Sequence, residues 1–82
     1  MPTFSFTLRL DEPETTTEEA AERLYGKANE DLRIQDILLA TSEGVSTVDM
    51  SLQANDLQEA IKYGLKFVED ERYKVSLMRV DM

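Results

Sequence analysis

The feature that most constrains the fold is an apolar stripe of helical period within residues 51–69. Its members recur three or four residues apart, as on one face of an α-helix, and are Leu57, Ala60, Ile61, Gly64, Leu65 and Val68. Such a stripe becomes stable by packing against another apolar surface. Gly64 costs about 1 kcal/mol relative to alanine within a helix. Its presence indicates that this helix closely approaches a sheet.

Polar residues mark the start of the same helix. Asn55 is expected to cap free backbone N–H groups, and Gln58, three residues later, is expected to reach back to the cap. Asp56 and Glu59 place negative charge at the positive end of the helix dipole. The sequence therefore predicts an N-terminal cap at Asn55.

A first strand and a first helix precede this segment. Over residues 3–10, Phe4, Phe6, Leu8 and Leu10 alternate with Thr3, Ser5, Thr7 and Arg9, which predicts a strand with one buried face. Thr16 and Glu19 then have capping-box spacing. The helix that follows has an apolar stripe formed by Ala20, Ala21, Leu24, Tyr25 and Ala28.

The remaining segments predict a hairpin and a final strand. Residues 32–41 are rich in Ile and Leu, and the turn that follows ends in Gly44, which is free to take a positive φ. Residues 45–52 resume strand alternation, with Val48, Met50 and Leu52 on one face and Thr47, Asp49 and Ser51 on the other. Residues 73–80 form the last predicted strand.

The order strand, helix, strand, strand, helix, strand predicts the fold class. Two right-handed crossovers joined by a hairpin usually build a four-stranded antiparallel sheet of order 4-1-3-2 with both helices on one face. We therefore expect a single α+β domain over residues 1–82, the ferredoxin-like βαββαβ sandwich. The second and fourth strands would be its edges, and the apolar segment 34–40 a candidate interface for a homo-oligomer.

Several stretches carry a resemblance that extends over nearly the whole chain. They are the opening Thr-Phe-Ser-Phe at 3–6, the hairpin 36–45, the strand 47–50 and the helical segment 54–61. With these the sequence resembles a group of small stand-alone bacterial proteins of unassigned function. That group commonly carries a basic residue ahead of the alanine before the helix, whereas this chain reads Ser51-Leu52-Gln53-Ala54. The resemblance implies the ferredoxin-like fold and supplies no activity.

Composition excludes several kinds of site. The chain has no cysteine and no histidine, which excludes zinc centres of the usual kinds and Ser/His or Cys/His catalytic pairs. Its three glycines form no phosphate-binding loop, and Asp11, Glu12 and Glu14 lack the spacing of a calcium loop. We therefore expect no catalytic residues, no metal site and no cofactor. The start of the chain lacks the pattern of a signal peptide, and the expected location is cytoplasmic, without membrane binding.

Charge points to a class of partner. The formal net charge of −8 repels phosphate backbones, so nucleic-acid binding is disfavoured. Between residues 11 and 31 the chain holds eight carboxylates against Arg23 and Lys27. One interpretation is a solvated helix face that keeps the protein soluble. The other is a docking face for a basic protein, in which Glu18 and Glu22 would take part.

The uncovered face of the predicted sheet is the second candidate surface. Its central strands would present Ser and Thr side chains, with Arg9 and Asp49 on neighbouring central strands and Arg79 on the other side of Arg9. No aromatic platform for RNA is present there. This face is interpreted as a solvated sheet or as a docking or self-association surface, with a polar ligand pocket as a further alternative. Together the two surfaces give the candidate interaction residues Thr7, Arg9, Thr47, Asp49, Glu18 and Glu22.

Two hypotheses of function follow. The first is a non-enzymatic acidic interaction module, such as an inhibitor, an antitoxin-like neutraliser or an adaptor, that binds a basic protein partner. The second is a dimeric regulatory domain of the ACT type that senses a small ligand. ACT-type binding needs a glycine-bearing loop after the first strand, and residues 11–14 contain no glycine.

Overall fold

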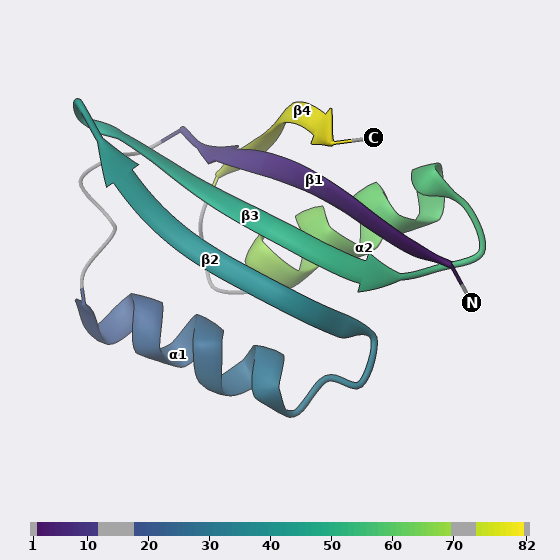
Figure 1. Ribbon diagram of the computed structural model, residues 1–82. Helices are drawn as coiled ribbons and strands as arrows, with labels where there is room; N and C mark the ends of the chain where they lie inside the picture. Colours follow the sequence, from purple (N-terminus) through teal and green to yellow (C-terminus); the bar gives the residue numbers. More distant parts are fainter. Residues whose placement is uncertain (1, 12–17, 70–73, 82) are drawn as a thin grey trace.

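The fold is α+β, with a four-stranded antiparallel sheet and two helices. The computed structural model describes residues 2–11, 18–69 and 74–81, with residues 18–20 described by their backbone alone. Its elements are β1 (Thr3–Leu10), α1 (Glu18–Asn29), β2 (Ile34–Ser42), β3 (Val45–Gln53), α2 (Leu57–Glu69) and β4 (Val75–Asp81) (Figure 1). The strand order β2-β3-β1-β4 is the predicted order 4-1-3-2 read from the opposite edge.

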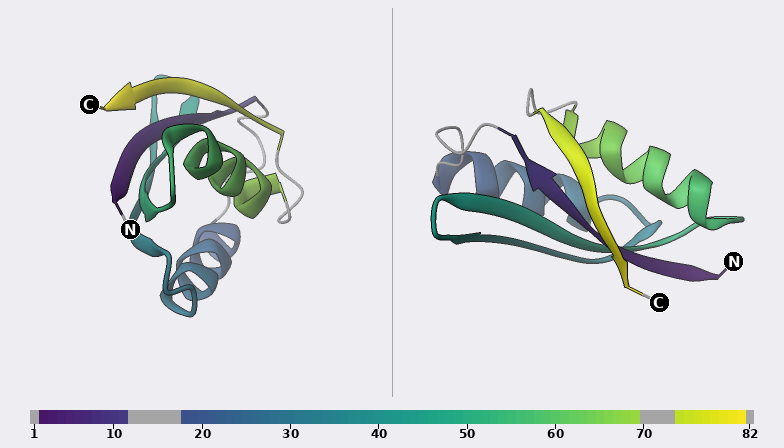
Figure 2. Two further views of the ribbon diagram at one scale, coloured as in Figure 1. Left: turned by 90° about the vertical axis from the view of Figure 1, so that its right-hand side faces the viewer. Right: turned by 90° about the horizontal axis from the view of Figure 1, so that it is seen from above.

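Both helices cover the same face of the sheet (Figure 2). The central strands supply the buried side chains Phe6, Leu8, Leu10, Val48, Met50 and Leu52, and the helices supply Leu24, Ala28, Ala60, Phe67 and Val68. The alternation predicted for these strands is therefore confirmed, although Phe4 is only half-buried. Thr7 departs from the expectation of a solvated polar side, since it is only 2% exposed on the opposite face.

Gly64 lies where α2 approaches the sheet most closely. A Cβ atom at this position would lie 2.6 and 2.7 Å from two ring carbons of Phe6, which is itself fully buried. These separations are shorter than any normal contact between carbon atoms. The predicted close approach of helix and sheet is confirmed, and Gly64 is what permits it.

The hairpin between β2 and β3 closes through a tight two-residue turn. Ser42 pairs with Val45, and the two residues between them have positive φ, 52° at Glu43 and 78° at Gly44. Two positive φ values are the mark of a type I′ turn, whose twist matches that of the flanking strands. The sequence predicted this conformation for Gly44 but not for Glu43.

Three predicted boundaries shift. The second strand begins at Ile34 and not at residue 32, because backbone bonds from Asp31 N–H to Ala28 O and from Ile34 N–H to Asp31 O hold the preceding residues in turns. The last strand spans Val75–Asp81, and residue 73 lies outside the described residues, as does the predicted cap at Thr16.

The third shift concerns the cap of α2. The chain stays extended through Ala54, whose N–H is donated to Pro2 O, so the helix begins at Leu57. Asp56 Oδ1 accepts the N–H of Glu59 at 2.7 Å, and Glu59 Oε2 accepts the N–H of Asn55 at 3.3 Å. The predicted Asn55 and Gln58 cap is therefore wrong by one residue.

Neither helix in the described part of the chain has the length and apolar character needed to cross a membrane.

Candidate functional site

The face of the sheet opposite the helices, called the open face below, brings together four of the predicted residues. Thr7 pairs with Asp49 of β3 and with Arg79 of β4, whereas Arg9 pairs with Thr47 and Ser76. Asp49 and Arg79 thus flank Thr7. Arg9 and Asp49 lie on the neighbouring central strands β1 and β3, as predicted, but Arg79 lies beside Thr7 and not beside Arg9, because the register of β4 on β1 shifts between Thr7 and Leu8.

Polar side chains on the open face already bond to one another across the central strands. The Ser5 and Ser51 hydroxyls lie 2.7 Å apart, and the Thr7 hydroxyl donates to Asp49 Oδ1 at 2.5 Å. At the β4 edge, Arg79 Nε lies 3.3 Å from Asp81 Oδ1. Leu38 of β2 is placed beside Asp49 on this face and is 54% exposed. The Ser5, Ser51 and Thr7 hydroxyls of the open face are therefore satisfied, and an exposed apolar side chain lies at one side of it.

The two acidic residues predicted to take part lie elsewhere. Glu18 and Glu22 belong to α1, in the helix layer on the other side of the sheet (Figure 2). Glu22 is exposed, and the side chain of Glu18 is not described. The candidate interaction residues thus form two separate surfaces, and one flat partner surface cannot contact both.

Sequence reasoning missed a cleft of about 660 Å³ between the two helices. The side chains around it come from the end of α1, the turn that follows and the middle of α2, namely Lys27, Glu30, Asp31, Leu32, Arg33, Tyr63, Lys66 and Phe67. The two groups are about thirty positions apart in the chain, and only the fold brings them together.

Arg33 is the centre of the polar network that forms one end of this cleft. Its guanidinium Nη2 lies 2.7 Å from Glu59 Oε1, its Nε donates to Gln53 O at 3.2 Å, and its Cζ lies 4.7 Å from the centre of the Tyr63 ring. Asp31 completes the network, since Oδ1 accepts the Arg33 N–H at 2.9 Å and Oδ2 accepts the Tyr63 hydroxyl. These bonds hold the turn after α1 firmly to α2.

The network changes the ionisation of two of its members. The hydrogen bond from Arg33 lowers the pKa of Glu59 below its usual value, so that this carboxylate is charged at neutral pH. The bond to the Asp31 carboxylate, with a smaller effect of burial, raises the pKa of Tyr63. Tyr63 therefore remains a protonated donor across the physiological range.

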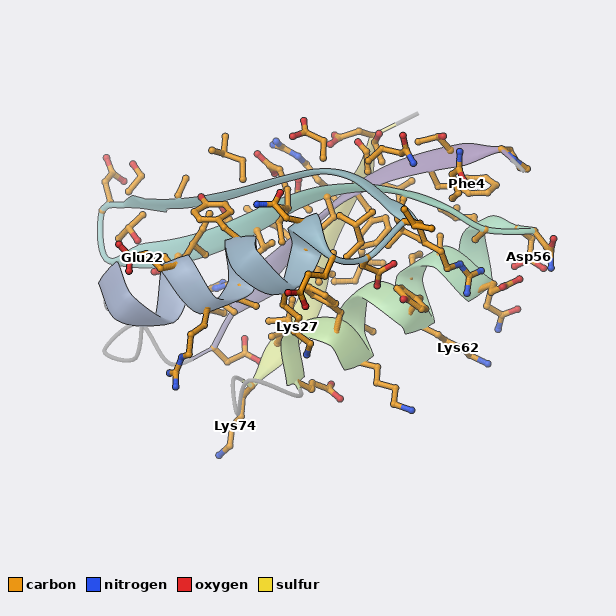
Figure 3. The ribbon with its side chains drawn as sticks, turned by 90° about the horizontal axis from the view of Figure 1, so that it is seen from below. Phe4, Glu22, Lys27, Asp56, Lys62 and Lys74 are labelled. Atoms are coloured by element: carbon orange, nitrogen blue, oxygen red, sulfur yellow. The ribbon has the colours of Figure 1, made fainter. Side chains whose placement is uncertain are left out.

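At the other end of the cleft, Lys27 of α1 reaches α2 (Figure 3). Its Nζ lies 4.7 Å from the centre of the Phe67 ring and donates to Phe67 O at 3.4 Å. Phe67 is in the last turn of α2, where carbonyl groups lack a partner within the helix, so Lys27 both caps α2 and covers an aromatic ring.

Comparison with known proteins supplies no family for this arrangement. No family model matches the sequence, and no curated protein is significantly similar to it.

One signal of the cleft was nevertheless present in the sequence. Tyr63 and Phe67 are four residues apart and so lie on one side of α2, beside the predicted apolar stripe and not within it. An aromatic pair next to a core stripe is a reason to expect a second contact surface.

Proposed function

We propose that this chain is a ferredoxin-like βαββαβ domain that acts as a non-enzymatic interaction module and docks a basic protein partner on its open face. The strand order and the position of both helices on one face support the ferredoxin-like assignment. Membership of the group of small bacterial proteins that the sequence resembles belongs to the same proposal. Inhibitor, antitoxin-like neutraliser and adaptor are the roles that such a module serves.

The observation that carries the docking role is the internal pairing of the open face. Covering a polar surface normally costs free energy because its hydrogen bonds to water are lost. Here the Ser5–Ser51 and Thr7–Asp49 bonds persist when water is displaced. Covering these hydroxyls therefore costs little, and the exposed Leu38 adds apolar area that a partner would bury.

Charge selects a basic partner over a neutral or acidic one. The register places Asp36, Asp49 and Asp81 on the open face with Arg9 and Arg79 as the opposing cations, and the whole chain has a net charge of −8. Long-range attraction would speed the encounter with a basic protein and weaken as salt screens it. The same net charge opposes association of two copies, so any homo-oligomer needs local contacts strong enough to offset this repulsion.

Affinity capture from lysate of the source organism tests the proposal with two charge-matched variants. Leu38→Arg places a cation on the open face, and Glu22→Gln removes an anion from α1, so each raises the net charge by one. We expect a partner that the wild type retains at low salt and releases at high salt. Leu38→Arg should lower its recovery by about tenfold, and Glu22→Gln by less than about twofold, because buried like charges cost far more than exposed ones. The reverse ranking, or no salt-sensitive partner, would overturn the proposal.

A second candidate, the small-ligand regulatory domain acting as a dimer, is favoured by the cleft. Its volume of about 660 Å³ lies within the range of roughly 300–1,000 Å³ typical of small-molecule sites. A ligand that binds only the folded state raises the melting temperature. A thermal-shift screen of amino acids, nucleotides and small organic acids that gives no stabilisation would remove this candidate.

A further inference from the structure

The cleft between α1 and α2 has two walls with different chemistry. One wall carries Lys27, Glu30 and Leu32 from the end of α1 and the turn after it. The other consists of Tyr63, Lys66 and Phe67 on α2. The aromatic rings hold the two walls together, because each is covered by a cation from the opposite wall at 4.7 Å. The cleft is therefore a preformed feature and does not require an incoming ligand to assemble it.

Most charges near the cleft are already engaged. Asp31 accepts two hydrogen bonds, Arg33 bonds to Glu59, and Lys27 bonds to the end of α2. A ligand that competed for these groups would have to break the contacts that fix the walls. These engaged groups fix the shape of the cleft, but they do not determine which charge its ligand carries.

Two groups remain available to a ligand. Lys66 is exposed on the α2 wall, and within the described residues no hydrogen bond or ion pair ends at its ammonium group. Leu32 is 91% exposed on the opposite wall, while Phe67, on the α2 wall, is 6% exposed. An apolar body would thus contact Leu32 and the aromatic side of α2 while an anionic group reached Lys66.

From this arrangement we propose that the inter-helix cleft binds a small organic monocarboxylate with an apolar body. The carboxylate would pair with Lys66, and the apolar body would lie between Leu32 and the aromatic side of α2. Glu30 on the rim sets the limit on charge, since a second negative group on the ligand would be repelled by it. The net charge of −8 has little effect at this range, because salt screens charges beyond about 8 Å at physiological ionic strength.

The proposal deepens the second candidate function by naming its ligand class, and it does not depend on docking at the open face. Its test is an NMR titration of the ¹⁵N-labelled protein with 4-phenylbutyrate and with the uncharged 4-phenylbutyramide. We expect shifts at residues 30–33 and 63–67 with both probes. The carboxylate should bind about tenfold more tightly, as expected for one charge-assisted contact.

Two lysines on α2 provide the matched variants. Lys66 borders the cleft, whereas Lys62, also exposed and on the same helix, points away from α1 (Figure 3). Lys66→Gln should abolish most of the tenfold preference for the carboxylate and leave binding of the amide unchanged, whereas Lys62→Gln should change neither by more than about twofold. A third variant, Leu32→Ser, should weaken both probes alike.

The outcomes separate this proposal from the second candidate. Cleft shifts with equal affinity for both probes, or equal losses in Lys66→Gln and Lys62→Gln, would overturn the monocarboxylate assignment and leave a small-molecule site in place. Absence of cleft shifts with either probe at 10 mM would overturn the assignment, and the thermal-shift screen would then decide whether the cleft binds other small molecules.

Discussion

At the scale of single residues, the two helical glycines have opposite surroundings. Gly26 of α1 is exposed and has nothing within 4 Å of a Cβ position, whereas a Cβ at Gly64 would collide with the Phe6 ring. Alanine is the better helix former at both positions. Helix propensity therefore favours alanine at both positions, whereas tertiary packing opposes alanine at Gly64.

Substituting each glycine by alanine should change stability in opposite directions. We expect Gly26→Ala to stabilise the protein by about 1 kcal/mol, from helix propensity alone. Gly64→Ala should destabilise it by roughly 1–3 kcal/mol, because the buried ring must move. Urea unfolding followed by circular dichroism measures both. Adding Phe6→Leu should lessen the effect of Gly64→Ala, and a stabilised Gly64→Ala protein would contradict the close contact.

Glu43 is the second residue whose backbone sets an expectation. Its φ of 52° is unfavourable for a residue with a long side chain, while asparagine adopts this region readily at a type I′ turn. Glu43→Asn should raise the free energy of unfolding by about 0.5–1 kcal/mol. Glu43→Gln is the control, because it removes the same charge without the backbone preference. If both variants raise the free energy of unfolding equally, the gain comes from loss of the charge and not from the backbone preference.

Tyr63 should give the protein a specific response to alkaline pH. Its pKa is raised in the folded state, so the stability due to the Tyr63–Asp31 bond is complete below the unfolded value of about 10 and is lost as pH rises through the folded pKa. Absorbance at 295 nm should show one tyrosine that ionises late. Asp31→Asn should return this transition toward pH 10, and Tyr63→Phe should remove it. A late transition that survives in Tyr63→Phe would belong to another tyrosine.

At the scale of elements, the two edge strands differ in how they resist pairing. The Tyr25 hydroxyl of α1 accepts the N–H of Leu39 at 2.8 Å and donates to the carbonyl of the same residue at 3.4 Å. It therefore occupies the middle of β2, within the segment predicted as an interface. At the other edge, the register between β1 and β4 shifts between Thr7 and Leu8 of β1, and this shift breaks the regular ladder. Strand-to-strand association is thus hindered at both edges by different means.

Removing the Tyr25 hydroxyl should expose the β2 edge. We expect Tyr25→Phe to self-associate at lower protein concentration than the wild type, because Leu39 regains a free donor and acceptor on an apolar strand. Light scattering coupled to gel filtration over a concentration series gives the masses. Tyr63→Phe is the matched control, since it loses a hydroxyl that lies away from this edge. Identical masses for Tyr25→Phe and wild type would show that the hydroxyl does not guard the edge.

At the scale of the whole molecule, charge of one sign dominates. Seventeen acidic residues face nine basic ones in a chain of 82, and the compact state concentrates this excess. The Arg33–Glu59 pair opposes the repulsion locally, but it is partly exposed, and pairs of this kind contribute little. Self-repulsion should therefore exceed attraction in the salt dependence of stability.

Salt should consequently stabilise this protein. The melting temperature is expected to rise by a few degrees between 10 mM and 0.5 M NaCl, because the Debye length falls from about 30 Å to below about 8 Å. Glu22→Lys reduces the net charge from −8 to −6, so its melting temperature should rise less over the same range. A melting temperature that falls with salt would indicate that ion pairs outweigh the repulsion.

Local sequence patterns were sufficient to predict the order of the elements and the buried sides of β1, β3 and α2. Alternation in 3–10 and 45–52 and the stripe of α2 are local patterns, set by the repeat of strand and helix, and the buried residues follow them. Even Gly64 could be interpreted locally, because a glycine that weakens a helix needs a compensating contact. Right-handed connections then left few ways to order four strands.

Tertiary structure alone decided which polar groups meet. The cap at Asp56 lies one residue from the predicted position, and Thr7, the residue beside Asp49 and Arg79, lies two residues from Arg9 on the same face of β1. Neither difference changes the hydrophobic pattern. The cleft depends on contacts between segments about thirty positions apart, such as Arg33 with Tyr63. Burial of apolar side chains repeats with the period of the strand or helix and tolerates small changes in position, so it can be predicted from a sequence pattern. Hydrogen bonds and ion pairs require positions correct to a fraction of an ångström, and these are fixed only when the whole chain has packed.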